Sequence, residues 1–415
     1  MSQISRVPLA GELPPVRIGV AALTRMSFLG MDLAPLWHSL LEKVALNQDR
    51  AASVMDLSVI AQLLGDQKSG LELQAGALAT ERFYRSPCVA AHPKLRVLAL
   101  AAPTDIGGNT PLEFLLEGSD VELCTCYVVP GAPLPESMPA HDVAFVAAPA
   151  SVSTRDSLAA ISALVEGFRC PTLNKPANIM ELDRDRLYLR LSDMPGLELP
   201  MTVRVSRADL QIIAQSESTL PNFLADGHFP LIVRPIDSHA GRGLSRLQNA
   251  SDIDDYLNAR SEDEFFLSRY VDYSGSDGLF RKYRIVFVDG RPYACHMAIS
   301  DQWKIWYLNA EMAASPPKRS EEQHFMETFD ECFAVRHAGA FAELARRIGL
   351  DYFAIDCAET KDGRLLLFEA DNAMIVHDMD PVEIFPYKAP QMRCIFDAFV
   401  AMLFKKSAAA LVLAA

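Results

Sequence analysis

The sequence predicts an α/β protein that begins with a helical segment. Apolar residues recur at helical spacing from about Asp32 to Arg85. From Leu95 onward, short apolar runs alternate with helical stretches, which is typical of a layered α/β fold. After Gly275 the chain becomes rich in strand-like runs and ends in a strong hairpin signal. We therefore expect a helical N-terminal segment, then a small open α/β sheet domain, then a larger part with two further lobes.

Length and charge define the broad class of protein. The 415 residues are 50% hydrophobic and 22% charged, which indicates a globular chain of enzyme size with about two or three domains. The 39 Lys and Arg against 53 Asp and Glu give a net charge of -14, which argues against a nucleic-acid or anionic-membrane binder. No apolar run reaches the roughly 20 residues of a membrane helix, and the N-terminus lacks the apolar core of a signal peptide. We expect a cytoplasmic protein whose eight cysteines are mostly buried, reduced thiols.

The first expected unit, residues 1–94, is the helical segment. Its apolar positions predict three helices, and they are Leu33, Leu36, Leu40, Leu41 and Val44, then Met55, Leu57, Ile60, Leu63 and Leu64, then Leu71, Leu73, Ala77 and Leu78. One helical pair resembles a tetratricopeptide-like hairpin, but no second copy follows at the required period. We expect a helical layer that packs on the rest of the chain or on a second subunit, which leaves a homodimer open.

The second expected unit, residues 95–176, is an open sheet of about four strands. The predicted strands are 95–102, 121–129, 142–148 and 171–174, with a helix near 157–168. Another helix follows the first strand, where Thr110 is suited to the N-cap and Glu113 to a capping box. This helix start either binds an anion or is simply well capped.

The third and fourth expected units are residues 177–272 and 273–405. Their predicted helices lie near 207–215, 252–259 and 331–348, and their predicted strands are 231–235, 264–271, 283–288, 293–299, 352–359 and 364–370. The last two strands are joined by Lys361-Asp-Gly363, and Asp-Gly between alternating apolar runs is a strong hairpin signal.

Three carboxylates stand within the apolar strands of this hairpin. Glu369 and Asp371 are two residues apart and therefore face the same side of their strand, where Asp356 of the neighbouring strand can join them. Carboxylates gathered in an apolar setting repel one another without a cation, and rigid oxygen ligands suit Mg²⁺. The alternative is a structural role at the strand ends.

A cationic group precedes the carboxylates in the chain. Arg234 ends an apolar strand and is followed by a small-residue loop whose glycines, Gly241 and Gly243, let backbone amides approach an anion. Lys282 and Arg284 enter the next strand. Alone this pattern also fits an ordinary turn, but cations followed by a carboxylate cluster suit a nucleotide with its metal.

Together these motifs resemble the ATP-grasp superfamily, and especially its ribosomal-protein-S6-modification and glutathione-synthetase-like branches. The resemblance rests on a strand ending in Arg-Pro and a Gly-x-Gly loop, then Arg-Lys-Tyr-Arg-Ile-Val-Phe-Val-Asp-Gly, then Asp356 and Glu369-x-Asp371. It covers about residues 95–400 and implies a two-lobed ATP-grasp fold for the third and fourth units.

The resemblance assigns nucleotide-binding residues. Arg186 and Arg234 match positions where the family commonly uses lysine for the ATP phosphates, with Asp183-Arg184 as the alternative register for the first. The glycine loop, in which Ser238, His239, Gly241 and Gly243 contact nucleotide, corresponds to the flap over the phosphates. Arg269, Tyr270 and Val271 match the interlobe strand that reads adenine, although the family usually has an acidic residue at Arg269. Lys282 joins this nucleotide set.

The resemblance also assigns the reaction and its catalytic groups. Arg234 and Arg284 act on the transferred phosphate or acyl phosphate, while Asp356, Glu369 and Asp371 hold Mg²⁺ or Mn²⁺. The implied enzyme is an ATP-dependent ligase that joins a small-molecule or peptide carboxylate to an amine through an acyl phosphate. Two alternatives remain, a kinase of the same fold and a domain that binds nucleotide or a partner without turnover. The sequence does not identify the substrates.

Overall fold

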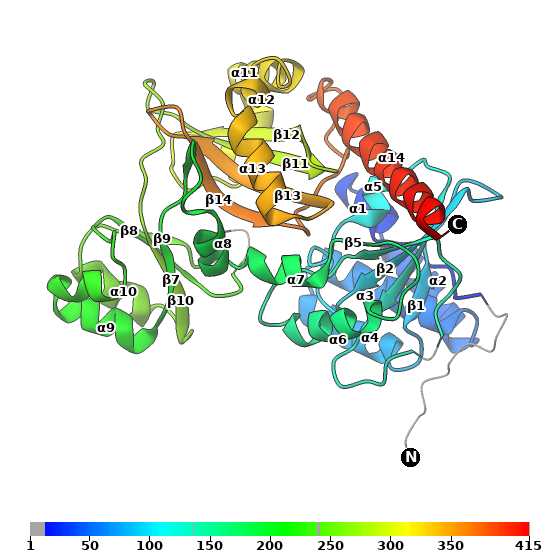
Figure 1. The fold of residues 1–415 in the computed structure, drawn as a ribbon. Coiled ribbons are helices and arrows are strands. Elements are labelled where there is room, and N and C mark those ends of the chain that lie inside the picture. The colour runs from blue at the N-terminus through cyan, green and yellow to red at the C-terminus, as the bar shows by residue number, and fades with distance from the viewer. Residues whose placement is uncertain (1–12, 136, 239–240, 415) are drawn as a thin grey trace.

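Three sheets organise the part of the chain that the structure, a computed structural model, describes, namely residues 13–135, 137–238 and 241–414. Figure 1 shows them as three separate blocks joined by helices and long connections. Helices and strands alternate through all three, so the predicted α/β class is confirmed.

The first sheet has a parallel centre. Its strands are β2 (Leu95–Ala101), β3 (Val121–Tyr127), β4 (Val143–Val146) and β5 (Thr172–Leu173), with the short β1 (Phe83–Arg85) antiparallel on the edge of β3. The strand order is β1-β3-β2-β4-β5. The sequence predicted the four parallel strands. It missed β1, which comes from the segment expected to be helical.

The N-terminal helices form a layer on this sheet. They are α1 (Val20–Phe28), α2 (Ala34–Ala45), α3 (Arg50–Leu63) and α4 (Gln67–Leu78). Met55 of α3 packs with Tyr84, Ala101 and Tyr127 of the sheet in one buried cluster. The segment was expected to pack on the rest of the chain or on a second subunit, and in the structure it packs on the first sheet of its own chain.

The helix expected after β2 is shorter than predicted. It is the single turn α5 (Leu112–Leu115), whose N-cap position is Pro111. The Thr110 hydroxyl donates to the backbone oxygens of Ala147 and Asn372. The predicted capping box is therefore wrong, because both side chains bind residues distant in the sequence. Glu113 accepts from the guanidinium of Arg17 at 2.5 Å.

The second sheet is antiparallel and has its own hydrophobic core. Its strands are β7 (Thr202–Ser206), β8 (Leu231–Pro235), β9 (Ser245–Leu247) and β10 (Glu264–Arg269), in the order β7-β10-β8-β9. Helices α9 (Arg207–Gln215) and α10 (Ser251–Asn258) cover it. Ser206 and Asp209 form a capping box that begins α9 directly after β7.

The third sheet carries the predicted hairpin. Its strands are β11 (Phe280–Val288), β12 (Arg291–Ser300), β13 (Tyr352–Glu359) and β14 (Leu365–Asp371), with β6 (Leu197–Glu198) parallel to β14 at the edge. Gly363 has a φ of +81°, as the tight Asp-Gly turn requires. The helix expected at 331–348 is interrupted at His337 and becomes α12 (Phe333–Arg336) and α13 (Ala338–Ile348).

The remaining described helices connect the sheets. They are α6 (Arg155–Val165), α7 (Pro176–Ile179), α8 (Arg184–Leu191), α11 (Pro316–Glu327) and α14 (Lys388–Ala414), with short 3-10 turns at 180–182, 217–222, 307–310 and 312–314. Figure 1 shows α14 passing from the third sheet to the first. Its Phe399 ring lies 5.6 Å from that of Phe145 in β4 and 5.2 Å from that of Tyr352 in β13. The first and third sheets thus share one core. Among the described helices, none has the length and apolar character to cross a membrane.

Candidate functional site

A cavity of about 1920 Å³ is lined by residues of all three sheets. Thr125 of β3, Ser268 of β10 and Asp356 of β13 are among its walls. The cavity contains most of the side chains that the sequence singled out and is therefore the candidate site.

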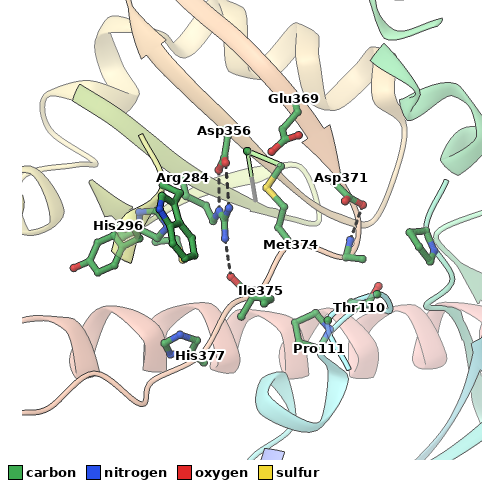
Figure 2. A pocket seen from close by; sticks show the side chains of 18 of the residues that line it. Thr110, Pro111, Arg284, His296, Asp356, Glu369, Asp371, Met374, Ile375 and His377 are labelled. Carbon is green, nitrogen blue, oxygen red and sulfur yellow. Dashed lines mark hydrogen bonds and ion pairs between the residues drawn. The ribbon is translucent and has the colours of Figure 1, made fainter. Parts of the chain in front are cut away.

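Asp356 forms the centre of the cationic part of the cavity. It is 1% exposed and lies opposite Arg284 in the register of β11 and β13. The Arg284 Nε donates to Oδ1 at 2.8 Å and Nη2 donates to Oδ2 at 3.1 Å, while the Lys282 ammonium lies 2.6 Å from Oδ2. Figure 2 shows the Arg284 guanidinium bridging Asp356 and the backbone oxygen of Ile375, at 3.1 Å. The Asp356 carboxylate therefore holds the Arg284 and Lys282 side chains at the wall of the cavity.

These contacts fix the protonation state of Asp356. Burial raises the pKa of the carboxyl, but the charges of Arg284 and Lys282 and their hydrogen bonds outweigh burial and hold the pKa well below its usual range. The same pairing raises the pKa of the Arg284 guanidinium against its own burial. Asp356 is an anion at every physiological pH.

Glu369 lies beside Asp356 on the neighbouring strand, β14. The two residues are paired in the register of β13 and β14. The Glu369 carboxylate forms an ion pair with Arg184, whose Nη1 also donates to the backbone oxygen of Phe368 at 2.7 Å. Burial raises the pKa of Glu369, but the charges of Arg184, Lys282 and Arg234 together outweigh burial and hold the pKa below its usual value. Glu369 is therefore also ionised.

Asp371 lies at the end of β14 and is turned toward the following backbone. Its Oδ1 accepts from the Ala373 amide at 2.9 Å, as Figure 2 shows. Within the described residues, no group of three or more His, Cys, Asp or Glu side chains is gathered as a metal site. Asp356 and Glu369 are paired in the register of β13 and β14, and carboxylate oxygens are ligands that Mg²⁺ prefers. The third ligand remains a prediction.

The sequence offered two arginines of α8 for the first phosphate-binding position, and only Arg184, the alternative, reaches the cavity. Arg184, the first residue of α8, lines the cavity. Arg186 is half exposed, lies outside the cavity lining and pairs with Glu181 at 3.1 Å. The assignment of Arg186 thus needs correction, because two residues farther along a helix a side chain points to a different face.

Arg234 reaches the cavity from the end of β8. Its Nε donates to the Ser238 hydroxyl at 3.1 Å, and its Nη2 donates to the Ser238 backbone oxygen. Burial, followed by the charge of Arg184, lowers the pKa of Arg234 to about 9, so it is a desolvated cation at neutral pH. Such a cation binds an anion strongly. Ser238 supports Arg234 and does not line the cavity.

The glycine loop is shaped by two positive φ angles. Gly241 and Gly243 have φ values of +69° and +67°, and a Cβ on Gly243 would lie 2.5 Å from the Pro235 ring. The Lys304 ammonium donates to the Leu244 backbone oxygen at 3.0 Å and so fixes the far end of the loop. Gly241 lines the cavity and Gly243 does not. His239 lies outside the described residues.

The predicted adenine-reading segment also lines the cavity. Arg269 forms ion pairs with Glu198 and, at 2.9 Å, with Asp226, so its charge is compensated within the protein. Tyr270 and Val271 follow the end of β10 and line the cavity. Arg269, which departs from the family pattern, is thus neutralised by Glu198 and Asp226, and the two residues that follow it line the cavity.

The structure adds residues that the sequence did not assign. Arg246 lies over the rings of Tyr270, at 4.8 Å, and Trp303, at 5.6 Å. His296 lines the cavity and is paired with Arg284 in the register of β11 and β12. Lys388, 3% exposed, lines the same end of the cavity. Charge alone does not distinguish these residues from surface ones in the sequence.

The fold and the site define a three-sheet α/β protein with a cation-rich cavity around paired carboxylates. No model of a known protein family matches the sequence, and no curated protein matches it significantly. Several solved structures are similar to it in fold. A RimK domain ATP-grasp protein from Sphaerobacter thermophilus is 17% identical with a TM-score of 0.42, covering 74% of this chain and 99% of its own.

Two further solved structures show the same level of similarity. The D-alanine–D-alanine ligase of Bacillus anthracis, complexed with ATP, is 13% identical with a TM-score of 0.44, covering 75% of this chain and 96% of its own. The ATP-grasp ligase PsnB, complexed with the precursor peptide PsnA2 and AMPPNP, is 12% identical with a TM-score of 0.42, covering 76% and 99%.

Proposed function

We propose that this chain is an ATP-grasp enzyme that joins a carboxylate to an amine at the expense of ATP, with Mg²⁺ at the paired carboxylates. One observation carries the proposal. Four cationic side chains and two ionised carboxylates meet in one cavity, and they are Arg184, Arg234, Lys282, Arg284, Asp356 and Glu369. A polyphosphate needs cations around its oxygens and a metal between them, and this arrangement offers both.

The reaction in this proposal has two steps. An oxygen of the substrate carboxylate attacks the γ-phosphorus of ATP, the bond to the bridging oxygen breaks, and ADP leaves. The amine nitrogen then attacks the acyl carbon, phosphate leaves with the electron pair of the C–O bond, and the amine loses a proton. Mg²⁺ neutralises the phosphate oxygens when it is bound.

The chain's own residues position the reactants. Arg234 from the second sheet and Arg184 from α8 bind the polyphosphate, and the glycine loop offers its backbone amides. Arg284 faces the transferred group from the third sheet, held by Asp356 and by the Ile375 backbone oxygen. Binding and orientation thus supply most of the catalysis.

The test follows ADP release while a panel of amino acids and dipeptides is offered with Mg-ATP and hydroxylamine. The ligase predicts ADP release that depends on one carboxylate, with trapping of that carboxylate as a hydroxamate. ADP release with a phosphorylated hydroxyl and no hydroxamate would identify a kinase instead. Absence of Mg-ATP binding in calorimetry would overturn both.

A further inference from the structure

The cavity extends away from the paired carboxylates, between the N-terminal helices and the first sheet. We call this part the N-terminal arm. It is lined by residues of α1, α3, β2 and β3, which are Val20, Thr24, Met55, Val59, Ala99, Ala101, Thr125 and Tyr127. The helical segment that the sequence left without a role is therefore a wall of the same cavity.

The arm lies where an open parallel sheet normally binds a ligand. In the order β3-β2-β4, the chain leaves β2 toward one side and returns to β4 on the other, so the carboxyl ends of β2 and β4 form a switch point. The loop 104–110, which follows β2, lines the cavity there. On the strands, Ala99 and Ala101 pair with Thr125 and Tyr127, and the two small side chains leave the space open.

Arg17 lies buried at the wall of the arm with unused donors. It is 5% exposed, and its Nη2 donates to Glu113 at 2.5 Å. Its Nε and Nη1 are buried and have no hydrogen-bond partner among the described residues. A buried donor without a partner is destabilising, so a ligand oxygen at either atom would be stabilising.

The charges around Arg17 favour an uncharged oxygen. Glu113 already neutralises the guanidinium, and Asp56 lies near it, accepting from the amides of Ile18 at 2.8 Å and Gly19 at 3.2 Å. Burial lowers the pKa of Arg17, but Tyr127, Glu113 and Asp56 together raise it above its usual value. An added carboxylate would meet this excess of acids, whereas a carbonyl oxygen adds no charge.

The geometry of the two donors also argues against a carboxylate. In a planar guanidinium, Nε and Nη1 do not belong to the same two-donor fork, because each shares a fork with Nη2 instead. A single carboxylate cannot bridge them side by side. Two separate oxygens, such as successive amide carbonyls, can.

We propose that the N-terminal arm binds an apolar group that carries uncharged amide carbonyls, with Arg17 donating to those oxygens from Nε and Nη1. The substrate class is thus a peptide or an acylated amino-acid amide. Calling this ligand the substrate rests on the proposed ligase function, but its binding does not. The arm and the paired carboxylates line one cavity, so a ligand in the arm can extend toward the proposed reaction centre.

The experiment measures dissociation constants by saturation-transfer NMR without ATP, using N-acetylleucinamide and its acid, N-acetylleucine. The two probes share the apolar side chain and the acetyl carbonyl and differ in one charge. We expect the amide to bind at least threefold more tightly than the acid. Tighter binding of the acid, or no binding of either probe to the wild-type chain, overturns the proposal.

Substitutions test whether N-acetylleucinamide binds in the N-terminal arm. Thr24→Trp fills the arm and should abolish binding of N-acetylleucinamide, whereas Leu41→Trp, on the exposed face of α2 and outside the cavity lining, should leave it unchanged. Arg17→Met should weaken binding about tenfold, and thermal unfolding reports whether it folds. Unchanged binding in Thr24→Trp contradicts the assignment even if Arg17→Met does not fold. Calorimetry with Mg-ATP on the same proteins separates failure of the arm from failure of the ligase function.

Discussion

Arg284 and Asp356 lie directly opposite each other in two neighbouring antiparallel strands, joined by two hydrogen bonds of 2.8 and 3.1 Å. The pair is almost fully enclosed, with the Asp356 side chain 1% and the Arg284 side chain 19% exposed. A carboxylate expected to bind metal thus also orients the arginine expected to bind the transferred phosphate. The two roles are coupled through one side chain.

We expect Asp356→Asn to reduce turnover at least 100-fold, because it removes a metal ligand and releases Arg284 and Lys282. Breaking a buried pair should also lower the free energy of unfolding by about 3 kcal/mol. Steady-state ADP release and chemical denaturation measure the two effects. Asp330→Asn, which breaks an exposed pair with Arg291, is the control and should change neither. Turnover that survives in both Asp356→Asn and Glu369→Gln would contradict the metal assignment.

The two arginines of α8 provide a matched pair. Arg184→Ala should weaken binding of Mg-ATP about tenfold, because Arg184 lines the cavity, while Arg186→Ala should change it less than twofold. The variants lose the same charge from the same helix, so the net charge cannot explain a difference. Isothermal titration calorimetry measures both. A larger effect of Arg186→Ala would restore the register that the sequence favoured.

The glycine loop can be tested against a turn elsewhere. Gly243→Ala places a Cβ 2.5 Å from Pro235 and should raise the KM for ATP severalfold, since the loop must move. Gly278→Ala has a similar φ, +78°, but meets nothing within 4 Å. Both variants should lose about 1 kcal/mol of stability from backbone strain. An equal change of KM in both would show that the position of the loop does not matter.

His296 predicts a dependence of stability on pH. Burial, followed by the charges of Arg284 and Lys388, holds the pKa of its imidazole well below the usual range, so it is neutral in the folded protein. Below the unfolded pKa of about 6.5 only the unfolded chain binds this proton, so stability is complete above that pH and falls as the pH decreases.

We therefore expect the wild-type chain to lose about 2 kcal/mol more than His296→Gln between pH 7 and pH 5. Urea denaturation at the two pH values measures the difference between the proteins. The comparison cancels every group that both proteins share. Equal losses would show that His296 is protonated in the folded state.

The sequence predicted those parts of the fold that depend on neighbours in the chain. The hairpin around Lys361-Asp-Gly363 was predicted because turn chemistry and strand periodicity are local, and the pairing of Asp356 with Glu369 followed from it. The α8 arginine was misplaced because Asp-Arg occurs twice, two residues apart, and only the packing of the helix separates the two registers.

The sequence missed contacts between distant segments. The spacing of Thr110 and Glu113 has the pattern of a capping box, yet Glu113 binds Arg17, 96 residues earlier in the chain. The place of α1 depends likewise on Arg25 and Asp378, 353 residues apart. No local pattern records such pairs, so the N-terminal wall of the cavity emerged only from the structure.

The hydrophobic cores divide the described part of the chain into two bodies that can move relative to each other. The first and third sheets share one buried core through α14, whereas the second sheet has its own. The second sheet carries Arg234 and the glycine loop, and the third carries Asp356 and Glu369. Small-angle scattering with and without Mg-ATP would register a change of angle between these bodies.

A hinge movement of the second sheet would leave both hydrophobic cores packed. The contacts that it breaks are the polar ones between the second and third sheets, among them the ion pair of Arg269 with Glu198. Such contacts weaken with ionic strength far more than a hydrophobic core does. Salt should therefore weaken the expected binding of Mg-ATP well before it unfolds the chain.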